Sequence, residues 1–404
     1  MLSLSKHKID LGNSPTRPDP DTRFILMKTR ERVYYFDWLR IFAVVMLVPF
    51  HTGMIFVTWS FHIKNDVLSQ GLTDLNGFIH IWHMPLFFLV SGAGTWFALG
   101  FRSGGEYAKE RLLRLFVPLV FGMLAIIPPQ VYLERIFQHQ FTGSYFEFWP
   151  SIFTTGPYPQ GNLSWHHLWF LAYLFVFSML LLPIFLWMRS DKARARLSRT
   201  ADFFSQNARV FLLAGPLVLI QFLLRLHWPD GNQNLIDDWA NFFYHSTTFI
   251  FGSLLLTDRK YLEAIERNRY GALAVAVLCA LVIKIISIPS GNIIAAMALN
   301  GFDGFNTWCW LLVLLGFGRK HLNFTNKVRD YAVEAALPFY ILHQTFIIII
   351  GFYVIQWRIA LMLKFLLIIV LTFITVLMVY DLVVKRIGPI RFLFGMKSKK
   401  PSAG

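Results

Sequence analysis

Charged residues are scarce in this chain of 404 residues, at 15% of the total, and acids are scarcer than bases. Soluble domains carry roughly 25% charged residues, whereas 55% of this chain is hydrophobic. A soluble protein of this composition would need an implausibly large core, but a lipid-facing protein would not. The composition therefore argues against an ordinary soluble enzyme and predicts an integral membrane protein.

Cysteine is nearly absent as well, since only Cys279 and Cys309 occur, both in apolar stretches. Two such residues argue against a disulfide scaffold, a thiolate metal site and a palmitoyltransferase of the Asp-His-His-Cys type. The chain also lacks a His-Glu-x-x-His sequence. Ser91-Gly92 lacks the flanking glycines of a nucleophile elbow, so a serine-triad hydrolase is disfavoured. No metal ion is expected.

Basic residues are plentiful by comparison, with 38 Lys and Arg against 23 Asp and Glu and a net charge of +15. These cations do not gather in one soluble patch, as a nucleic-acid surface would require. They lie in short clusters between apolar runs, which is typical of cytoplasmic loops. We therefore expect membrane lipid, and not nucleic acid, as a partner.

Apolar windows of the length that crosses a bilayer, about 20 residues, recur along the chain. With the N-terminus inside, the inner segments carry 31 Lys and Arg and the outer segments carry 4. One miscounted helix would reverse the side of every later loop and destroy this asymmetry. The sequence predicts an all-α, polytopic membrane protein with about ten transmembrane helices and both termini in the cytoplasm. The windows lie near 34–58, 78–100, 115–133, 166–188, 210–226, 241–256, 270–288, 304–318, 332–355 and 361–384.

Three regions are expected: a cytoplasmic tail over 1–32, a transmembrane domain over 33–390 and a basic cytoplasmic tail over 391–404. Neither a second soluble domain nor an internal repeat is visible. The window at 304–318 is the weakest, because Gly301-Phe302-Asp303-Gly304 interrupts it early.

Ionisable residues inside a span are costly, so each is a functional candidate. In the first span Arg40 and His51 are eleven residues apart, which places them on one helix face about 16 Å apart. They cannot bond each other, but both can contact one long ligand. Asp37, three residues before Arg40, is placed to hold its guanidinium. Interfacial anchoring of Asp37 and Arg40, and an inter-helix hydrogen bond of His51, are the structural alternatives.

Other polar residues follow in the later spans. His80 and His83 are neighbours on one helix face near the outer side, without a convincing third metal ligand. Arg111 and Arg114 form a pair suited to bidentate phosphate binding, although ordinary positive-inside charge explains them equally well. Near the centre of the ninth window, His343 is either a structural hydrogen-bonding group or part of the site.

Several stretches together resemble the large integral-membrane acyltransferase family, which includes O-acetylases and a periplasmic glucan succinyltransferase. The match runs over about 33–390. It rests on Tyr35-Phe36-Asp37-Trp38-Leu39-Arg40 through His51, Phe-Phe-Leu-Val-Ser-Gly at 87–92, Arg111-x-x-Arg114, His167-Leu168-Trp169-Phe170-Leu171 and Pro-Phe-Tyr-Ile-Leu-His at 338–343. The pair His80 and His83 and the segment at 318–345 are most similar to the glucan-succinylating branch.

The resemblance implies an acyl-CoA co-substrate on the cytoplasmic side, a carbohydrate acceptor, no permanently bound cofactor, and a multi-pass location in the plasma (inner) membrane. Carried over by position, His51 is the catalytic base, with His343 as a second catalytic candidate. Arg40, Arg111 and Arg114 would bind the donor. The supporting residues would be Asp37, His80, His83, His167 and Tyr340. Transfer is expected to be direct, with a covalent acyl-histidine as the less favoured route.

Two other classes of protein remain open. A saccharide transporter or flippase also uses buried histidines, but no inverted repeat or matched pair of broken helices stands out. A glycosyltransferase that uses a polyprenyl-phosphate sugar usually shows an acidic cluster in its first outer loop, and here Asp66 and Asp74 are far apart. Which acyl group and which acceptor are used is not evident from the sequence, with acetyl and succinyl the leading choices.

Overall fold

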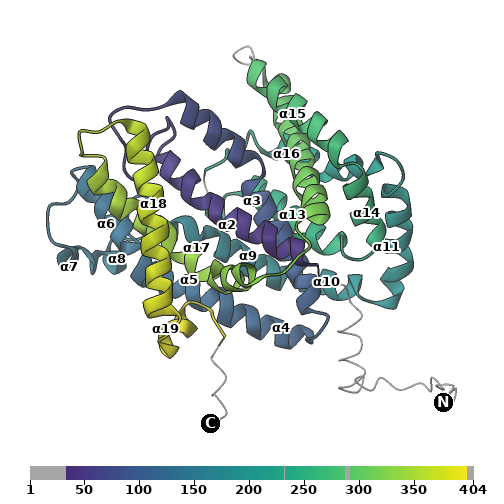
Figure 1. Cartoon of the computed structure of the whole chain (residues 1–404), viewed down its shortest axis with the longest axis horizontal. Helices are drawn as coiled ribbons and strands as arrows, with labels where there is room; N and C mark the ends of the chain where they lie inside the picture. Colours follow the sequence, from purple (N-terminus) through teal and green to yellow (C-terminus); the bar gives the residue numbers. More distant parts are fainter. Residues whose placement is uncertain (1–32, 232, 287–291, 398–404) are drawn as a thin grey trace, which may run out of the picture. The chain divides into compact units, whose positions relative to one another are not determined.

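The computed structural model describes residues 33–231, 233–286 and 292–397. Within these ranges the chain forms helices and turns, and no β-strand (Figure 1). Short 3-10 and π-helical segments, labelled η, continue or precede several α-helices. The elements are α2 (Tyr34–Met54), α3 (Gln70–Ala98), α4 (Gly104–Arg111), η1 (Leu112–Phe116), α5 (Val117–Phe121), η2 (Gly122–Ile126), α6 (Pro128–Phe137), α7 (Tyr145–Phe148), α8 (Ser151–Thr154), η3 (His166–Leu168), α9 (Trp169–Leu180), α10 (Leu182–Met188), α11 (Asp191–Phe204), η4 (Arg209–Ala214), α12 (Gly215–Leu224), α13 (Trp239–Leu254), α14 (Arg259–Arg267), α15 (Arg269–Ile285), α16 (Ile293–His321), α17 (Lys327–Val354), α18 (Leu361–Val379), η5 (Tyr380–Val384) and α19 (Gly388–Leu393).

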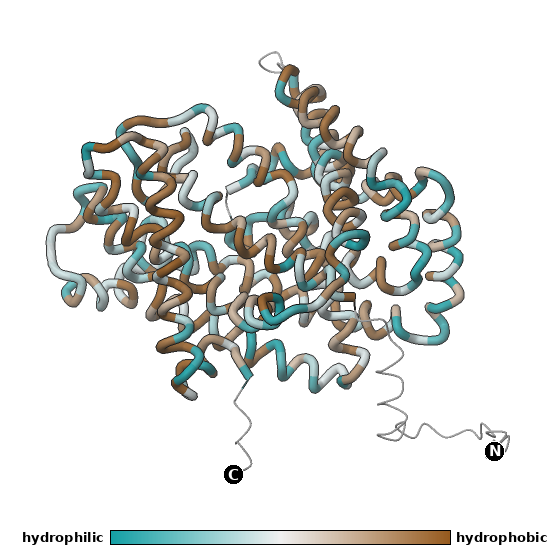
Figure 2. The backbone as a smooth tube through the Cα atoms, viewed as in Figure 1, coloured by the Kyte–Doolittle hydropathy of each residue, from teal (hydrophilic) through white to brown (hydrophobic). Residues whose placement is uncertain are grey.

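Several helices are long and apolar enough to cross a membrane, so the predicted all-helical membrane protein is confirmed. Figure 2 shows α18 as one of these, apolar along its length. Three bent helix pairs raise the number of candidate spans from five to as many as eight. The five are Tyr34–Met54, Gln70–Ala98, Gly104–Phe137, Lys327–Val354 and Leu361–Val384, and the pairs are His166–Leu180 with Leu182–Met188, Asp191–Phe204 with Arg209–Leu224, and Arg259–Arg267 with Arg269–Ile285.

The predicted count of ten spans is not confirmed. The windows at 241–256 and 304–318 fall on α13 and α16, which do not meet the same criteria of length and composition. Helix α13 has 16 residues, or about 24 Å of rise, which is less than the thickness of a hydrocarbon core. Helix α16 is long enough, but polar residues such as Asp303 and Asn306 interrupt its apolar run.

Two further expectations concern α16 and the C-terminal boundary. The window at 304–318 was predicted to be the weakest, and α16 is not among the candidate spans, although the helix itself runs without a break from Ile293 to His321. The domain boundary predicted at 390 falls inside α19, where Arg391 is buried and pairs with Glu334 of α17 at 3.4 Å. The N-terminal tail at 1–32 and residues 398–404 lie outside the described residues.

Helices α3 and α13 pack unusually closely at two glycines. A Cβ atom on Gly92 would lie 1.8 Å from the carbonyl oxygen of Phe249, and one on Gly252 would lie 1.8 Å from that of Leu89. The Ser253 hydroxyl donates a hydrogen bond of 2.7 Å to the Gly92 carbonyl oxygen across the same contact. Small residues let helix backbones approach each other in membranes. Gly92 and Gly252 therefore serve helix packing.

Helix α2 occupies an internal position, because α3, α16, α17 and α18 all pack against it. Its residues Tyr35, Leu39, Ala43 and Leu47 are buried at helical spacing. Polar side chains on α2 therefore meet other helices, and the first span can build a site with α3 on one side and α17 on the other.

Replacing Gly92 with alanine should destabilise the protein by about 1–3 kcal/mol or more, since the new methyl group collides with backbone. The midpoint of thermal unfolding in detergent measures this effect. Gly271→Ala in α15 is the matched control, because a Cβ there meets nothing within 4 Å. Equal midpoints for the two variants would contradict the close contact.

Candidate functional site

Three histidines from separate parts of the chain converge beside α2. His51 lies in the last turn of α2, His343 in the middle of α17, and His167 in η3 ahead of α9. The ring of His343 lies 5.1 Å from that of His51 and 4.9 Å from that of His167, centroid to centroid. His343 and His167 are buried, whereas His51 is only partly buried. The chain thus brings together three of the predicted site residues.

A chain of hydrogen bonds determines which nitrogen of His51 carries the proton. It begins at the Ile126 carbonyl oxygen, which accepts from the Thr345 hydroxyl at 2.8 Å. That hydroxyl must therefore accept from the amide nitrogen of Gln130 at 2.6 Å. The amide oxygen of Gln130 then accepts from the amide nitrogen of Gln344 at 3.1 Å. The remaining oxygen of Gln344 faces Nδ1 of His51 at 2.6 Å, so Nδ1 is the protonated donor.

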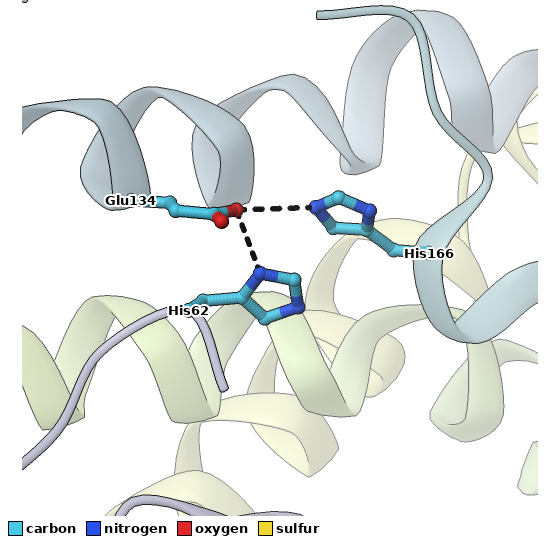
Figure 3. A group of neighbouring side chains, drawn as sticks. All are labelled: His62, Glu134 and His166. Atoms are coloured by element: carbon cyan, nitrogen blue, oxygen red, sulfur yellow. Dashed lines mark hydrogen bonds and ion pairs between the residues drawn. The ribbon is translucent and has the colours of Figure 1, made fainter. Parts of the chain in front are cut away.

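A second chain of bonds leads to the same assignment from a carboxylate. Glu134 of α6 accepts from Nδ1 of His62 at 2.7 Å (Figure 3). In the neutral form of His62, Nε2 therefore carries the lone pair, and it faces the amide nitrogen of Gln344 at 3.3 Å. Both chains place the amide nitrogen of Gln344 away from His51 and its oxygen toward it. Neutral His51 therefore has its lone pair on Nε2.

The other two rings are fixed by backbone carbonyl groups. His343 donates from Nδ1 to the Tyr340 carbonyl oxygen at 2.6 Å. Its Nε2 is buried and has no hydrogen-bond partner among the described residues. His167 donates from Nε2 to the Ile341 carbonyl oxygen at 3.1 Å, and the Tyr340 hydroxyl donates to the carbonyl oxygen of His167. Tyr340 thus fixes the His343 ring through its carbonyl oxygen and the backbone of His167 through its hydroxyl, while His343 offers a second free lone pair near His51.

His62, Glu134 and His166 have ligand atoms within 4.8 Å of one another, the spacing of a possible metal site (Figure 3). Nε2 of His166 is 3.9 Å from the Glu134 carboxylate and has no hydrogen-bond partner within the described ranges. However, the two imidazole rings stack 4.3 Å apart at an interplanar angle of 21°. Ring nitrogens bind a metal in the plane of the ring, so both rings would have to rotate to share one ion.

A group of cations lies around the first half of α2. Arg40 pairs with Asp37 at 4.0 Å, as predicted, and its guanidinium lies against Gly94 of α3. Arg111 and Arg114 lie close enough to Arg40 for their charges to act on its guanidinium. Arg111 stacks on the Tyr107 ring, whereas Arg114 donates to the Gly395 carbonyl oxygen and pairs with Glu110 at 3.3 Å.

Asp37 has a second partner that the sequence did not indicate. Arg329 of α17 lies 3.2 Å from the Asp37 carboxylate, closer than Arg40 does, and its exposed fraction is 5%. Arg329 also pairs with Asp330 and stacks on the Tyr34 ring. Asp37 therefore connects α2 to α17 as well as steadying Arg40.

The side chains of His80 and His83, predicted as a pair, contact different partners. His83 donates from Nε2 to the Ala43 carbonyl oxygen of α2 at 2.8 Å, which is a hydrogen bond between helices. His80 turns to the Asp230 carboxylate at 2.7 Å, in the loop before α13. Neither ring contacts the His51 ring directly. The Phe50 ring touches all three, at centroid distances of 5.3 Å to His51, 6.3 Å to His80 and 5.8 Å to His83.

The sequence analysis did not identify several residues of this network as candidate site residues: Gln344, Gln130, His62, Glu134 and Arg329. Gln344 and Gln130 are uncharged, so the search for ionisable residues in spans passed over them. Glu134 lies at the end of the third window, and His62 follows the first. A search for polar residues at the ends of windows would have found these two.

The fold and the site define a membrane protein whose buried cluster of histidines includes one oriented to accept a proton. The family model described as an acyltransferase domain matches residues 33–381. The chain therefore belongs to the acyltransferase-3 family, and it is an enzyme that transfers acyl groups. This confirms the resemblance seen in the sequence.

Curated relatives agree with this assignment. The chain is similar to the "Glucans biosynthesis protein C" of Salmonella typhi and to that of Salmonella typhimurium strain LT2. Each is 23% identical over 333 residues, which cover 80% of this chain and 84% of the relative. No solved structure matches the chain.

Replacing Asp37 with asparagine should destabilise the protein by about 1–3 kcal/mol, because the nearly buried Arg329 loses a charged partner. Asp330→Asn is the matched control, since Asp330 pairs with the same arginine but its side chain is 62% exposed, and its loss should cost about 0–1 kcal/mol. Thermal unfolding of both variants in detergent measures the difference. A larger loss in Asp330→Asn would refute the role given to Asp37.

Proposed function

We propose that this enzyme transfers a small acyl group, acetyl or succinyl, from acyl-CoA to a hydroxyl group of a cell-envelope carbohydrate such as a glucan, in the plasma membrane. The carbohydrate is supported by the names of the relatives, which are glucan biosynthesis proteins. The observation that carries the chemistry is the bond from Nδ1 of His51 to the Gln344 amide oxygen.

His51 is suited to act as a general base. A neutral imidazole with its lone pair on Nε2 can take a proton from a hydroxyl group at neutral pH. The Gln344 oxygen fixes the ring in this tautomer and stabilises the imidazolium that forms, as the orienting group of a catalytic triad does. Because Gln344 is neutral, it does not hold the proton on His51 by ion pairing. Partly buried His51 is also more accessible than fully buried His343.

The proposed reaction is a direct transfer. Nε2 of His51 takes the proton of the acceptor hydroxyl as its oxygen attacks the thioester carbonyl carbon. A carbon–oxygen bond forms, and a tetrahedral intermediate carries the negative charge. As the intermediate collapses, the carbon–sulfur bond breaks and the CoA thiolate takes the proton from His51. His343, whose free Nε2 is close by, can share the positive charge of the imidazolium.

The arginines supply the binding site for the donor in this account. CoA is a polyanion, and guanidinium groups bind phosphate bidentately. Arg40, Arg111 and Arg114 are neighbours at the end of α2 that the positive-inside pattern places in the cytoplasm. A CoA molecule held there by its phosphates could extend its pantetheine arm along α2, so that the thioester reaches His51.

Purified protein in nanodiscs should release free thiol from acetyl-CoA or succinyl-CoA when a glucan acceptor is supplied. His51→Ala should lower this rate by about 10²–10⁴-fold, the usual contribution of a general base. Arg40→Ala should raise the KM for the donor more than it lowers kcat. His321→Ala and Arg194→Ala are matched controls at exposed positions.

Near-normal transfer by folded His51→Ala protein would refute the assigned base. If no donor reacts even with membrane glycans present, and the protein instead moves saccharide across vesicles without a donor, the function is transport. An acyl-enzyme trapped without acceptor would replace direct transfer with the covalent route.

Gln344→Leu should lower kcat by about tenfold or more, since loss of about 1.4 kcal/mol of orienting hydrogen bond corresponds to a factor of ten. The KM for the donor should stay unchanged, because Gln344 acts only through His51. Glu134→Gln should change kcat in the same direction and less strongly. Gln356→Leu, at an exposed position, controls for the substitution itself. A change confined to KM would contradict an orienting role.

A further inference from the structure

A cavity of about 640 Å³ lies outside the cluster of His51, His167 and His343, none of which lines it. Its walls come from α3, α9, α12, α13, α15, α16 and the loop between α12 and α13. The volume falls within the range of roughly 300–1,000 Å³ that small-molecule sites occupy. His80 lies on the wall and stacks on Phe50, whose ring also contacts His51. One aromatic ring therefore connects the cavity to the proposed base.

The polar part of the wall is rich in side-chain amides, namely Gln221, Gln233, Asn241 and Asn306. Asn306 is fully buried, and neither atom of its amide has a hydrogen-bond partner among the described residues. The indole nitrogen of Trp310 on the same helix is also unpaired within that part of the chain. Buried polar groups are nearly always paired. This wall thus holds donors and acceptors that a hydroxyl-rich ligand can satisfy after small side-chain rotations.

Aromatic rings line the same cavity: Phe78, Trp169, Tyr244 and Trp310. The indole and phenol rings combine an apolar face with a polar edge. A pyranose ring has the complementary character, since its faces present C–H groups and its rim presents hydroxyls. Amides that both donate and accept, placed beside flat aromatic faces, suit a sugar better than a lipid tail.

The charges in the cavity exclude the donor. Asp74 pairs with Lys284 at 2.8 Å, and Asp230 pairs with His80 at 2.7 Å. Burial raises the pKa of Asp230, but the charges of His80 and Arg225 outweigh it and hold that pKa well below its usual value. Asp303 also lies on the wall, so the number of acidic side chains there is comparable to the number of basic ones. The cavity therefore has no net positive field to attract the phosphates of CoA. The ligand expected here is neutral.

We propose that this cavity binds a sugar residue of the acceptor, with the reacting hydroxyl passing Phe50 to reach His51. This inference rests on the proposed function for the identity of the glycan, but sugar binding itself can be measured without any acyl donor. Donor and acceptor would then occupy opposite ends of the bundle around α2: phosphates at the arginines, and sugar in the amide-lined cavity.

The test is calorimetric binding of short, neutral glucose oligosaccharides to the full chain in nanodiscs. Gly77 lines the cavity, and a Cβ there meets nothing within 4 Å, so Gly77→Leu adds an apolar side chain at the cavity wall. Gly271→Leu in α15 is the matched control, because its Cβ also meets nothing within 4 Å and Gly271 is not on the wall. Asn306→Leu removes the unpaired amide at similar volume. Thermal midpoints check that each variant is folded.

We expect Gly77→Leu and Asn306→Leu to weaken oligosaccharide binding by about tenfold or more, while Gly271→Leu leaves it unchanged and acetyl-CoA binding is preserved in all three. The same oligosaccharide affinity in all variants would overturn the inference. So would displacement of the sugar by glycerol phosphate, which would indicate a lipid headgroup site. Sugar binding lost as expected in a protein without acyl transfer would support the cavity while refuting the proposed function.

Discussion

The site depends on the direction of one series of hydrogen bonds. It starts at the Ile126 carbonyl oxygen, passes through Thr345, Gln130 and Gln344, and ends at Nδ1 of His51. Each group can donate in only one direction once its neighbour is assigned. The Glu134–His62 pair approaches Gln344 from the other side and requires the same orientation. A neutral amide thus determines where the lone pair of His51 lies, and no charged partner competes for the proton.

In the proposed reaction, helix α2 would bring two unlike substrates together. Its first turns hold Arg40 among cations, and its last turn holds His51 beside Phe50 and the amide-lined cavity. The separation of about 16 Å along the helix suits a donor that is charged at one end and reactive at the other. A polyanion and a neutral sugar would be recognised by different chemistry, so neither would compete for the other's site.

The sequence predicted the apolar windows, the helix that carries Arg40 and His51, and the family, because these depend on local composition and spacing. It could not predict the convergence of His51 with His343 and His167, since 292 residues separate His51 from His343 along the chain. Gln344 was missed for another reason: the search for ionisable residues in spans does not select an uncharged amide, although burying one without a partner is also costly. The predicted span count exceeded the structural result for two reasons: α13 has only 16 residues, and polar residues such as Asp303 and Asn306 interrupt the apolar run of α16.

The most direct test of this account replaces His51 with methylated histidines and measures acyl transfer to glycan. A methyl group on Nε2 removes the lone pair, and the account predicts that transfer is abolished. A methyl group on Nδ1 breaks only the bond to Gln344 and keeps the lone pair on Nε2, so transfer should be reduced but measurable. Activity retained with Nε2 methylated, or lost only with Nδ1 methylated, would contradict the assignment of Nε2 of His51 as the base.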